Sequence, residues 1–142
     1  MNARRNDWYT SADWDDAARE LFDAKIRRSR RPWSKWQYFR GKANALFFSK
    51  DPDKIAAAIE LLGRALVEVA GIEPDWASAT HHRLGEFAEA VGDLGAAEAH
   101  YRQAIAACPL ADRTLAGRSS PEEDLARLLN AHGTRQAEQA RG

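Results

Sequence analysis

Alanine recurs at matching positions in three segments of the chain, and this recurrence is the strongest constraint on the fold. In each segment two alanines lie seven residues apart, with a large apolar residue between them. The three sets are Ala17, Leu21 and Ala24; Ala58, Leu62 and Ala65; and Ala97, Tyr101 and Ala104. Successive sets begin 41 and 39 residues apart. Because small side chains on one helix face let a second helix approach closely, the recurrence predicts packed helix pairs that repeat along the chain.

Capping residues and prolines predict the bounds of the first three helices. Ser11 is the expected N-cap of a helix over 13–28, which ends before Pro32. A second helix is expected over 34–49. Asp51, which a proline follows, is the expected N-cap of a third helix that ends near Gly71.

Three further helices are expected in the second half of the chain. They cover 74–91, 93–108 and 122–132, the last after a loop and a capping box made by Ser120 and Glu123. Gly133 is the expected end of the sixth helix. No segment alternates apolar and polar residues as a strand does, so the predicted fold class is all-α. Residues 1–133 are expected to form a single helical domain, and 134–142 a frayed polar tail.

The segment 78–109 is similar to a tetratricopeptide repeat. The matching residues are Leu84, Gly85, Gly92, Asp93, Ala97, Tyr101, Ala104 and Pro109. The segment departs from the family at His81, where a tryptophan is usual, and at Ala88, where an aromatic residue is usual. A looser copy covers about 36–70, and a half copy covers 12–26. The resemblance implies a TPR-like α-α superhelix of about six helices, with the sixth helix capping the stack.

The resemblance also implies a concave groove that binds a segment of another protein. Carried over residue by residue, the groove face would include Arg40, Asn44, Phe47, His82, Arg83 and Glu86. Arg40 and Asn44 resemble the pair with which some members hold a C-terminal carboxylate, and Arg83 resembles the arginine that assists them. The full clamp of the family is not present, and Glu86 would repel an acidic tail. The alternative is a groove filled by the chain's own Trp8 and Tyr9.

A basic segment connects the first two predicted helices. Between Asp23 and Asp51 the chain has nine Lys or Arg and no acid, although the net charge of the whole chain is zero. The basic patch at its start consists of Lys25, Arg27, Arg28, Arg30, Arg31 and Lys35. One interpretation is a solvated helix end that the helix dipole favours, with the nearby tryptophans in the core. The other is binding of single-stranded RNA, because basic side chains can contact its phosphates while the aromatic rings between them stack on its bases.

No pattern of catalytic, metal-ligating or phosphate-binding residues stands out, and no cofactor or metal is expected. The adjacent residues His81 and His82 point about 100° apart on a helix, so they do not form a ligand pair. Cys108 is expected to be a small buried residue. One cysteine and no apolar leader suggest a cytoplasmic protein without a membrane span.

The sequence thus predicts a non-catalytic protein–protein interaction module. Its partner would be another protein or peptide, and an acidic one would suit the basic patch. The alternatives are a helical-repeat protein that binds single-stranded RNA, and a small immunity or antitoxin-like neutralising protein. Dimerisation through an end helix is a further expectation.

Overall fold

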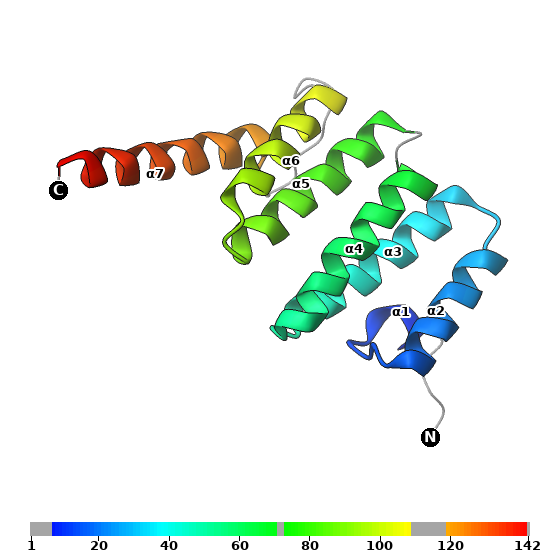
Figure 1. The fold of residues 1–142 in the computed structure, drawn as a ribbon. Helices are drawn as coiled ribbons and strands as arrows, with labels where there is room; N and C mark the ends of the chain where they lie inside the picture. The colour runs from blue at the N-terminus through cyan, green and yellow to red at the C-terminus, as the bar shows by residue number, and fades with distance from the viewer. Residues whose placement is uncertain (1–6, 71–72, 109–118, 142) are drawn as a thin grey trace. The chain divides into compact units, whose positions relative to one another are not determined.

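The computed structural model describes residues 7–70, 73–108 and 119–141, which form seven helices and no strand (Figure 1). The helices are α1 (Asp7–Thr10), α2 (Asp16–Arg28), α3 (Pro32–Phe48), α4 (Pro52–Glu68), α5 (Pro74–Ala90), α6 (Leu94–Ala107) and α7 (Pro121–Arg141). The all-α prediction is therefore confirmed for these residues. The chain divides into two compact units, residues 1–73 and 74–142, and each is described by itself.

Most predicted helix starts agree with the structure. The side chains of Asp51 and Asp93 accept hydrogen bonds from the backbone N–H groups of their first turns, and the Ser120 hydroxyl accepts one from the Glu123 N–H at 3.0 Å. The exception is the predicted cap at Ser11. The N-cap of α2 is Asp15, whose carboxylate accepts a 2.8 Å hydrogen bond from the Ala18 N–H.

The structure differs from the prediction in three other places. Helix α1 was not expected, since four residues show no periodicity. Helix α3 begins at Pro32 instead of Ser34, because proline fits the first helical position. Helix α7 continues through Gly133 to Arg141, since one glycine costs a helix only about 1 kcal/mol. The predicted stops at Gly71 and Pro109 and the loop over 110–118 lie outside the described residues.

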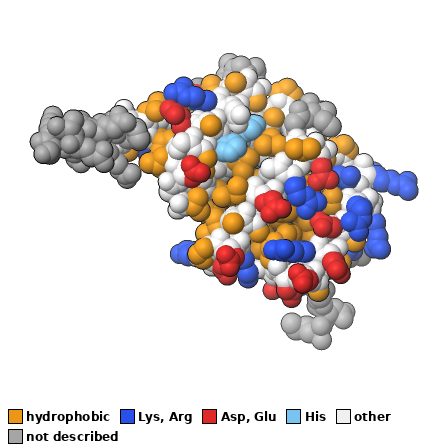
Figure 2. Space-filling view, viewed as in Figure 1, with side chains coloured by type: hydrophobic (Ala, Val, Ile, Leu, Met, Phe, Trp, Pro, Cys, Tyr) orange, Lys and Arg blue, Asp and Glu red, His pale blue; other side chains and the backbone are white. Residues whose placement is uncertain are grey.

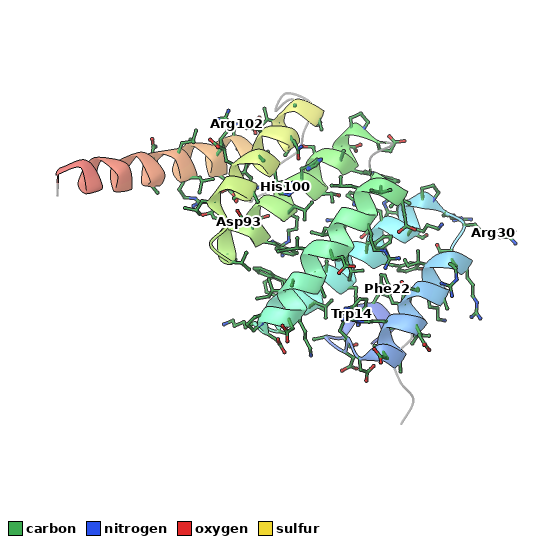
Figure 3. All side chains as sticks on the ribbon, in the orientation of Figure 1. Trp14, Phe22, Arg30, Asp93, His100 and Arg102 are labelled. Atoms are coloured by element: carbon green, nitrogen blue, oxygen red, sulfur yellow. The ribbon has the colours of Figure 1, made fainter. Side chains whose placement is uncertain are left out.

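In the first unit, α3 and α4 lie side by side and run in opposite directions (Figure 1). The set Ala58, Leu62 and Ala65 is fully buried, as its pattern predicts. The first set is different, because Ala17 is exposed and Leu21 is 46% exposed. Phe22, labelled in Figure 3, is buried in its place and contacts Phe39 of α3 with ring centroids 5.6 Å apart.

The segment before α2 lies across α3. Tyr9 contacts α3 at Gly41, where a Cβ atom would be only 2.8 Å from the tyrosine ring. The Lys42 ammonium donates a 2.8 Å hydrogen bond to the Ser11 carbonyl oxygen, and this lysine is 1% exposed. We name residues 7–15 the N-terminal strap. Glycine on one side and a buried lysine on the other thus hold the strap against α3.

In the second unit, α5 and α6 form the predicted hairpin. Gly85 leaves room for the Tyr101 ring, since a Cβ there would be 2.4 Å from a ring carbon. Ala97, Tyr101 and Ala104 are fully buried. Gly92 makes the turn with a positive φ of 84°, which glycine adopts without strain. Helix α7 packs on this hairpin through Leu128.

Candidate functional site

One face of α3 forms a pocket of about 420 Å³, which we name the α3 pocket. Its lining residues are Tyr9, Trp33, Ser34, Gln37, Tyr38, Arg40, Gly41 and Asn44. All but Tyr9 belong to α3 and recur every three or four positions, which places them on one side of the helix. The site therefore depends on a single rigid helix, with the strap supplying one wall.

Aromatic rings form the apolar part of the α3 pocket. The rings of Tyr9 and Tyr38 lie 4.9 Å apart, and the Trp8 ring lies 4.5 Å from Tyr38. Trp33 is 57% exposed, which corrects the interpretation that placed both tryptophans of this segment in the core. Trp36, which is buried, fits that interpretation. An exposed indole beside tyrosines offers a surface for an apolar or planar group.

The polar part of the pocket comes from Arg40, Asn44 and Gln37. The Arg40 guanidinium lies over the Trp36 ring at 4.4 Å, which limits the directions in which it can point. Guanidinium and amide groups together supply several N–H donors and two carbonyl acceptors. Such a set can hold a carboxylate and the backbone of a peptide at the same time.

The structure brings together two of the three residues that were predicted on α3. Arg40 and Asn44 both line the pocket, whereas Phe47 does not line it and contacts Phe48 with ring centroids 5.5 Å apart. The sequence reasoning missed Trp33 and Tyr38 as pocket residues, and named Tyr9 only in the alternative of a groove filled by the chain's own N-terminus. The helical period from Arg40 could have found Trp33. Tyr9 lies against Gly41 on this face, where it lines the pocket and leaves the rest of it open.

The basic patch lies where α2 ends and α3 begins. Arg27, Arg28, Arg30 and Arg31 are exposed, and Lys25 and Lys35 are partly buried. Figure 3 shows Arg30 extending away from the connection between the two helices. The Lys25 ammonium lies 6.0 Å from the centre of the Trp8 ring, which in turn contacts Tyr38 of the pocket. Positive charge therefore continues from the patch toward the α3 pocket.

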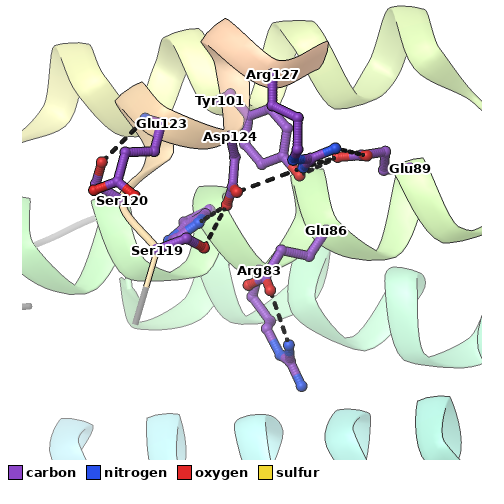
Figure 4. Close-up of polar contacts among 10 residues, drawn as sticks. Arg83, Glu86, Glu89, Tyr101, Ser119, Ser120, Glu123, Asp124 and Arg127 are labelled. Carbon is purple, nitrogen blue, oxygen red and sulfur yellow. Dashed lines mark hydrogen bonds and ion pairs between the residues drawn. The ribbon is translucent and has the colours of Figure 1, made fainter. Parts of the chain in front are cut away.

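The other predicted groove residues belong to α5, in the second unit. Glu86 lines a cavity of about 300 Å³ together with Glu89, Ala90, Tyr101, Asp124 and Arg127, which we name the α5–α7 cavity. Arg83 forms an ion pair with Glu86 at 3.4 Å and lies over the Phe87 ring. His82 lies 2.6 Å from Asp124, and the histidine N–H donates to the carboxylate. These side chains are engaged with neighbours of their own unit (Figure 4).

Glu89 lines the α5–α7 cavity and accepts hydrogen bonds from two side chains there (Figure 4). Its carboxylate accepts hydrogen bonds from the Tyr101 hydroxyl at 2.7 Å and from the Arg127 guanidinium at 2.8 Å. The bond from Arg127 lowers the pKa of Glu89 below its ordinary value, while burial opposes the shift. Burial raises the pKa of Tyr101, and the bond to Glu89 adds to that rise. This cavity is thus an anchor between α5, α6 and α7, and its charges are paired within the protein.

Asp124 also contacts a serine and a histidine, which resembles a hydrolytic triad in composition. Its carboxylate accepts from the Ser119 hydroxyl at 3.0 Å and from His82 at 2.6 Å, through the same oxygen. In a triad the serine bonds to the histidine, which removes its proton. Here the aspartate holds both side chains, so the arrangement ties the start of α7 to α5.

The pair of His81 and His100 was missed by the sequence reasoning, which compared each histidine only with residues near it in the sequence. His81 of α5 and His100 of α6 approach across the hairpin, with their Nδ1 atoms 3.2 Å apart. Burial lowers the pKa of both side chains, and the neighbouring His100 lowers that of His81 further. Among the described residues, no group of three or more His, Cys, Asp or Glu could hold a metal ion.

Comparisons with known proteins give no relative for this chain. No protein-family model matches it, and neither a curated protein nor a solved structure is significantly similar to it. In the part of the chain that the structure describes, every helix is too short or too polar to cross a lipid bilayer.

Proposed function

We propose that this chain is a TPR-like protein–protein interaction module that binds a partner segment in the α3 pocket and has no catalytic role. Two hairpins, α3–α4 and α5–α6, would be its successive repeats. Support comes from the matching sets Ala58–Leu62–Ala65 and Ala97–Tyr101–Ala104, which are all buried in their hairpins. The single cysteine of the chain, Cys108, is buried, which suits the cytoplasm as the place of action.

The observation that carries the proposal is the composition of the α3 pocket. A pocket of about 420 Å³ accepts one or two side chains, and its 57% exposed Trp33 offers them an apolar surface. Arg40 and Asn44 lie on the same wall. A peptide segment with an apolar or aromatic residue beside a carboxylate matches this combination.

The basic patch would serve the same partner by attracting it. Four exposed arginines, at the end of α2 and in its connection to α3, raise the association rate of an acidic segment, and salt reduces that effect. A partner with an acidic surface, such as a toxin that this chain neutralises, fits the same arrangement.

A selection from a random peptide library tests the proposal directly, because every kind of segment competes for the same pocket. The selected peptides should be acidic and aromatic. Trp33→Ala and Arg40→Glu should each weaken their binding by roughly tenfold or more, because central aromatic and arginine contacts carry most of the energy in an interface.

Arg102→Glu is the matched control, since it reverses one exposed charge on α6, which belongs to the other unit and does not line the pocket. It should leave the affinity unchanged, and all three variants should keep the helical circular dichroism of the wild type. Peptides that bind the wild type and the two pocket variants equally well would refute the proposal.

Single-stranded RNA is the second candidate ligand, favoured by the exposed Trp33 beside the arginines of the basic patch. Retention of single-stranded RNA on a filter at two salt concentrations tests it. Strong retention that falls steeply with salt and is lost in Arg30→Glu/Arg31→Glu would favour RNA. Absence of retention at low salt would dismiss it.

A further inference from the structure

His81 and His100 bring two imidazole nitrogens together from different helices. Their Nδ1 atoms lie 3.2 Å apart, their ring centroids 5.4 Å apart, and their ring planes differ by 30°. The two nitrogens therefore face each other, and in the absence of another ligand one ring donates a hydrogen to the other.

The distance between the nitrogens also matches that of two ligands on one metal ion. Zinc binds imidazole nitrogen at about 2.0–2.1 Å, which places two nitrogens of a tetrahedral site about 3.3 Å apart. A small rotation of both rings would direct their lone pairs at one point instead of at each other. The hydrogen-bonded pair thus needs little rearrangement to become a chelating pair.

The hairpin holds both histidines in place. Gly85 lies one helical turn after His81, and its contact with the Tyr101 ring brings the two helices close together beside the pair. Each ligand is fixed to a packed helix, which lowers the ordering cost of binding a metal.

The pair is also accessible. Both side chains are about half-buried, and Figure 2 shows a histidine surface in pale blue where Figure 3 labels His100. The Nε2 atom of His82 is not available to join the pair as a ligand, because it is hydrogen-bonded to Asp124.

We propose that His81 and His100 form a two-histidine site for a divalent ion of the late first-row transition metals, such as Cu²⁺ or Zn²⁺. Water would complete the coordination, since no third His, Cys, Asp or Glu joins the pair among the described residues. Because only two ligands come from the protein, the bound ion would exchange readily with ions in solution. Imidazole favours copper, nickel and zinc over magnesium or calcium, and copper binds most tightly in this series.

The protonation of the pair supports metal binding. Burial keeps the pKa of both histidines below the ordinary value, although a hydrogen bond with Gln103 and the charge of Asp93 act in the opposite direction on His100. Burial therefore favours the neutral rings that metal binding requires.

Titration calorimetry on chelator-treated, tag-free full-length protein tests the site, with CuCl₂, ZnCl₂ and MgCl₂ as separate titrants. We expect one Cu²⁺ per chain, weaker Zn²⁺ binding at the same site and no Mg²⁺ binding. His81→Asn and His100→Asn should each weaken Cu²⁺ binding by roughly tenfold or more, because one of two protein ligands is lost.

His82→Asn is the matched control, since it removes a neighbouring histidine outside the pair and should leave Cu²⁺ affinity unchanged. Circular dichroism should show that each variant keeps its helix content. The electron paramagnetic resonance spectrum of the Cu²⁺ form should show two coupled imidazole nitrogens in the wild type. No saturable binding, or binding that the double variant His81→Asn/His100→Asn retains, would overturn the proposal.

Discussion

Lys42 shows how one residue can fix a segment whose only regular structure is the four-residue helix α1. Its ammonium group is buried, donates to the Ser11 carbonyl oxygen and lies 5.6 Å from the centre of the Trp14 ring. Burial lowers the pKa of this lysine, and Asp13 partly offsets that shift. The same side chain therefore fastens the strap that forms one wall of the α3 pocket.

Replacement of this lysine should loosen the strap. In Lys42→Ala the Ser11 carbonyl loses its charged donor and the apolar stem of the lysine leaves a gap. We expect a loss of about 2 kcal/mol in the free energy of unfolding, measured by urea denaturation. Lys54→Ala, a partly buried lysine on α4, is the control and should change stability by less than about 0.5 kcal/mol. Equal stability of Lys42→Ala and the wild type would show that the contact of Lys42 with Ser11 contributes nothing to holding the strap.

The histidine pair should make stability depend on pH. Because the folded chain holds the pKa of His81 and His100 below 6.5, the unfolded chain binds more protons near that pH. The stabilising effect of neutral histidines is thus complete above about pH 7 and is lost as the pH falls through 6.5. Thermal melts with a chelator present should show a lower midpoint at pH 5.5 than at pH 7.5.

His81→Asn/His100→Asn should reduce this difference, which separates the histidines from the carboxylates that titrate at lower pH. A double variant with the same pH dependence as the wild type would contradict the assignment. Neither histidine could be paired from the sequence, because the contact joins positions 81 and 100 and depends on the rotation of both helices.

At the scale of elements, close packing of helices explains which predictions succeeded. The hairpin α5–α6 could be predicted because Gly85, Ala97 and Ala104 are small residues with a helical period and each has a packing role. Helix α2 was placed in the wrong register, since Ala17 and Leu21 imitate that pattern while Phe22 is the residue that is buried. Alanine and leucine are common in any helix, so an incomplete match to the repeat pattern, such as the one in α2, does not determine which helix face is buried.

Gly85 gives the sharpest test of hairpin packing. Gly85→Ala would place a Cβ 2.4 Å from the Tyr101 ring, and we expect a loss of about 1–3 kcal/mol in the free energy of unfolding. Gly95→Ala, in α6 of the same unit, meets only the Asp93 carboxylate at 4.0 Å and should be neutral or stabilising by up to about 1 kcal/mol. Denaturation of both variants measures the contrast. If Gly85→Ala is as stable as Gly95→Ala, the close approach of α5 and α6 is wrong.

At the scale of the molecule, the candidate site could be predicted only in part. The helical period and the family resemblance placed Arg40 and Asn44 on one face, and the structure puts both in the α3 pocket. Trp33 and Tyr38 were missed as pocket residues, and the packing of Tyr9 on α3 at Gly41 was expected only in the alternative of a groove filled by the N-terminus. His82, Arg83 and Glu86 were predicted for the same groove, but each has a polar partner within its own unit.

The proposed module therefore depends most on the α3 pocket as its binding surface. Nuclear magnetic resonance of ¹⁵N-labelled protein with an acidic, aromatic peptide from the library selection tests this claim most directly. The account predicts that the indole N–H of Trp33 and the side-chain signals of Arg40 and Asn44 shift on titration, with the backbone of α3 around them. Saturable shifts confined to residues outside the α3 pocket and the basic patch would contradict it.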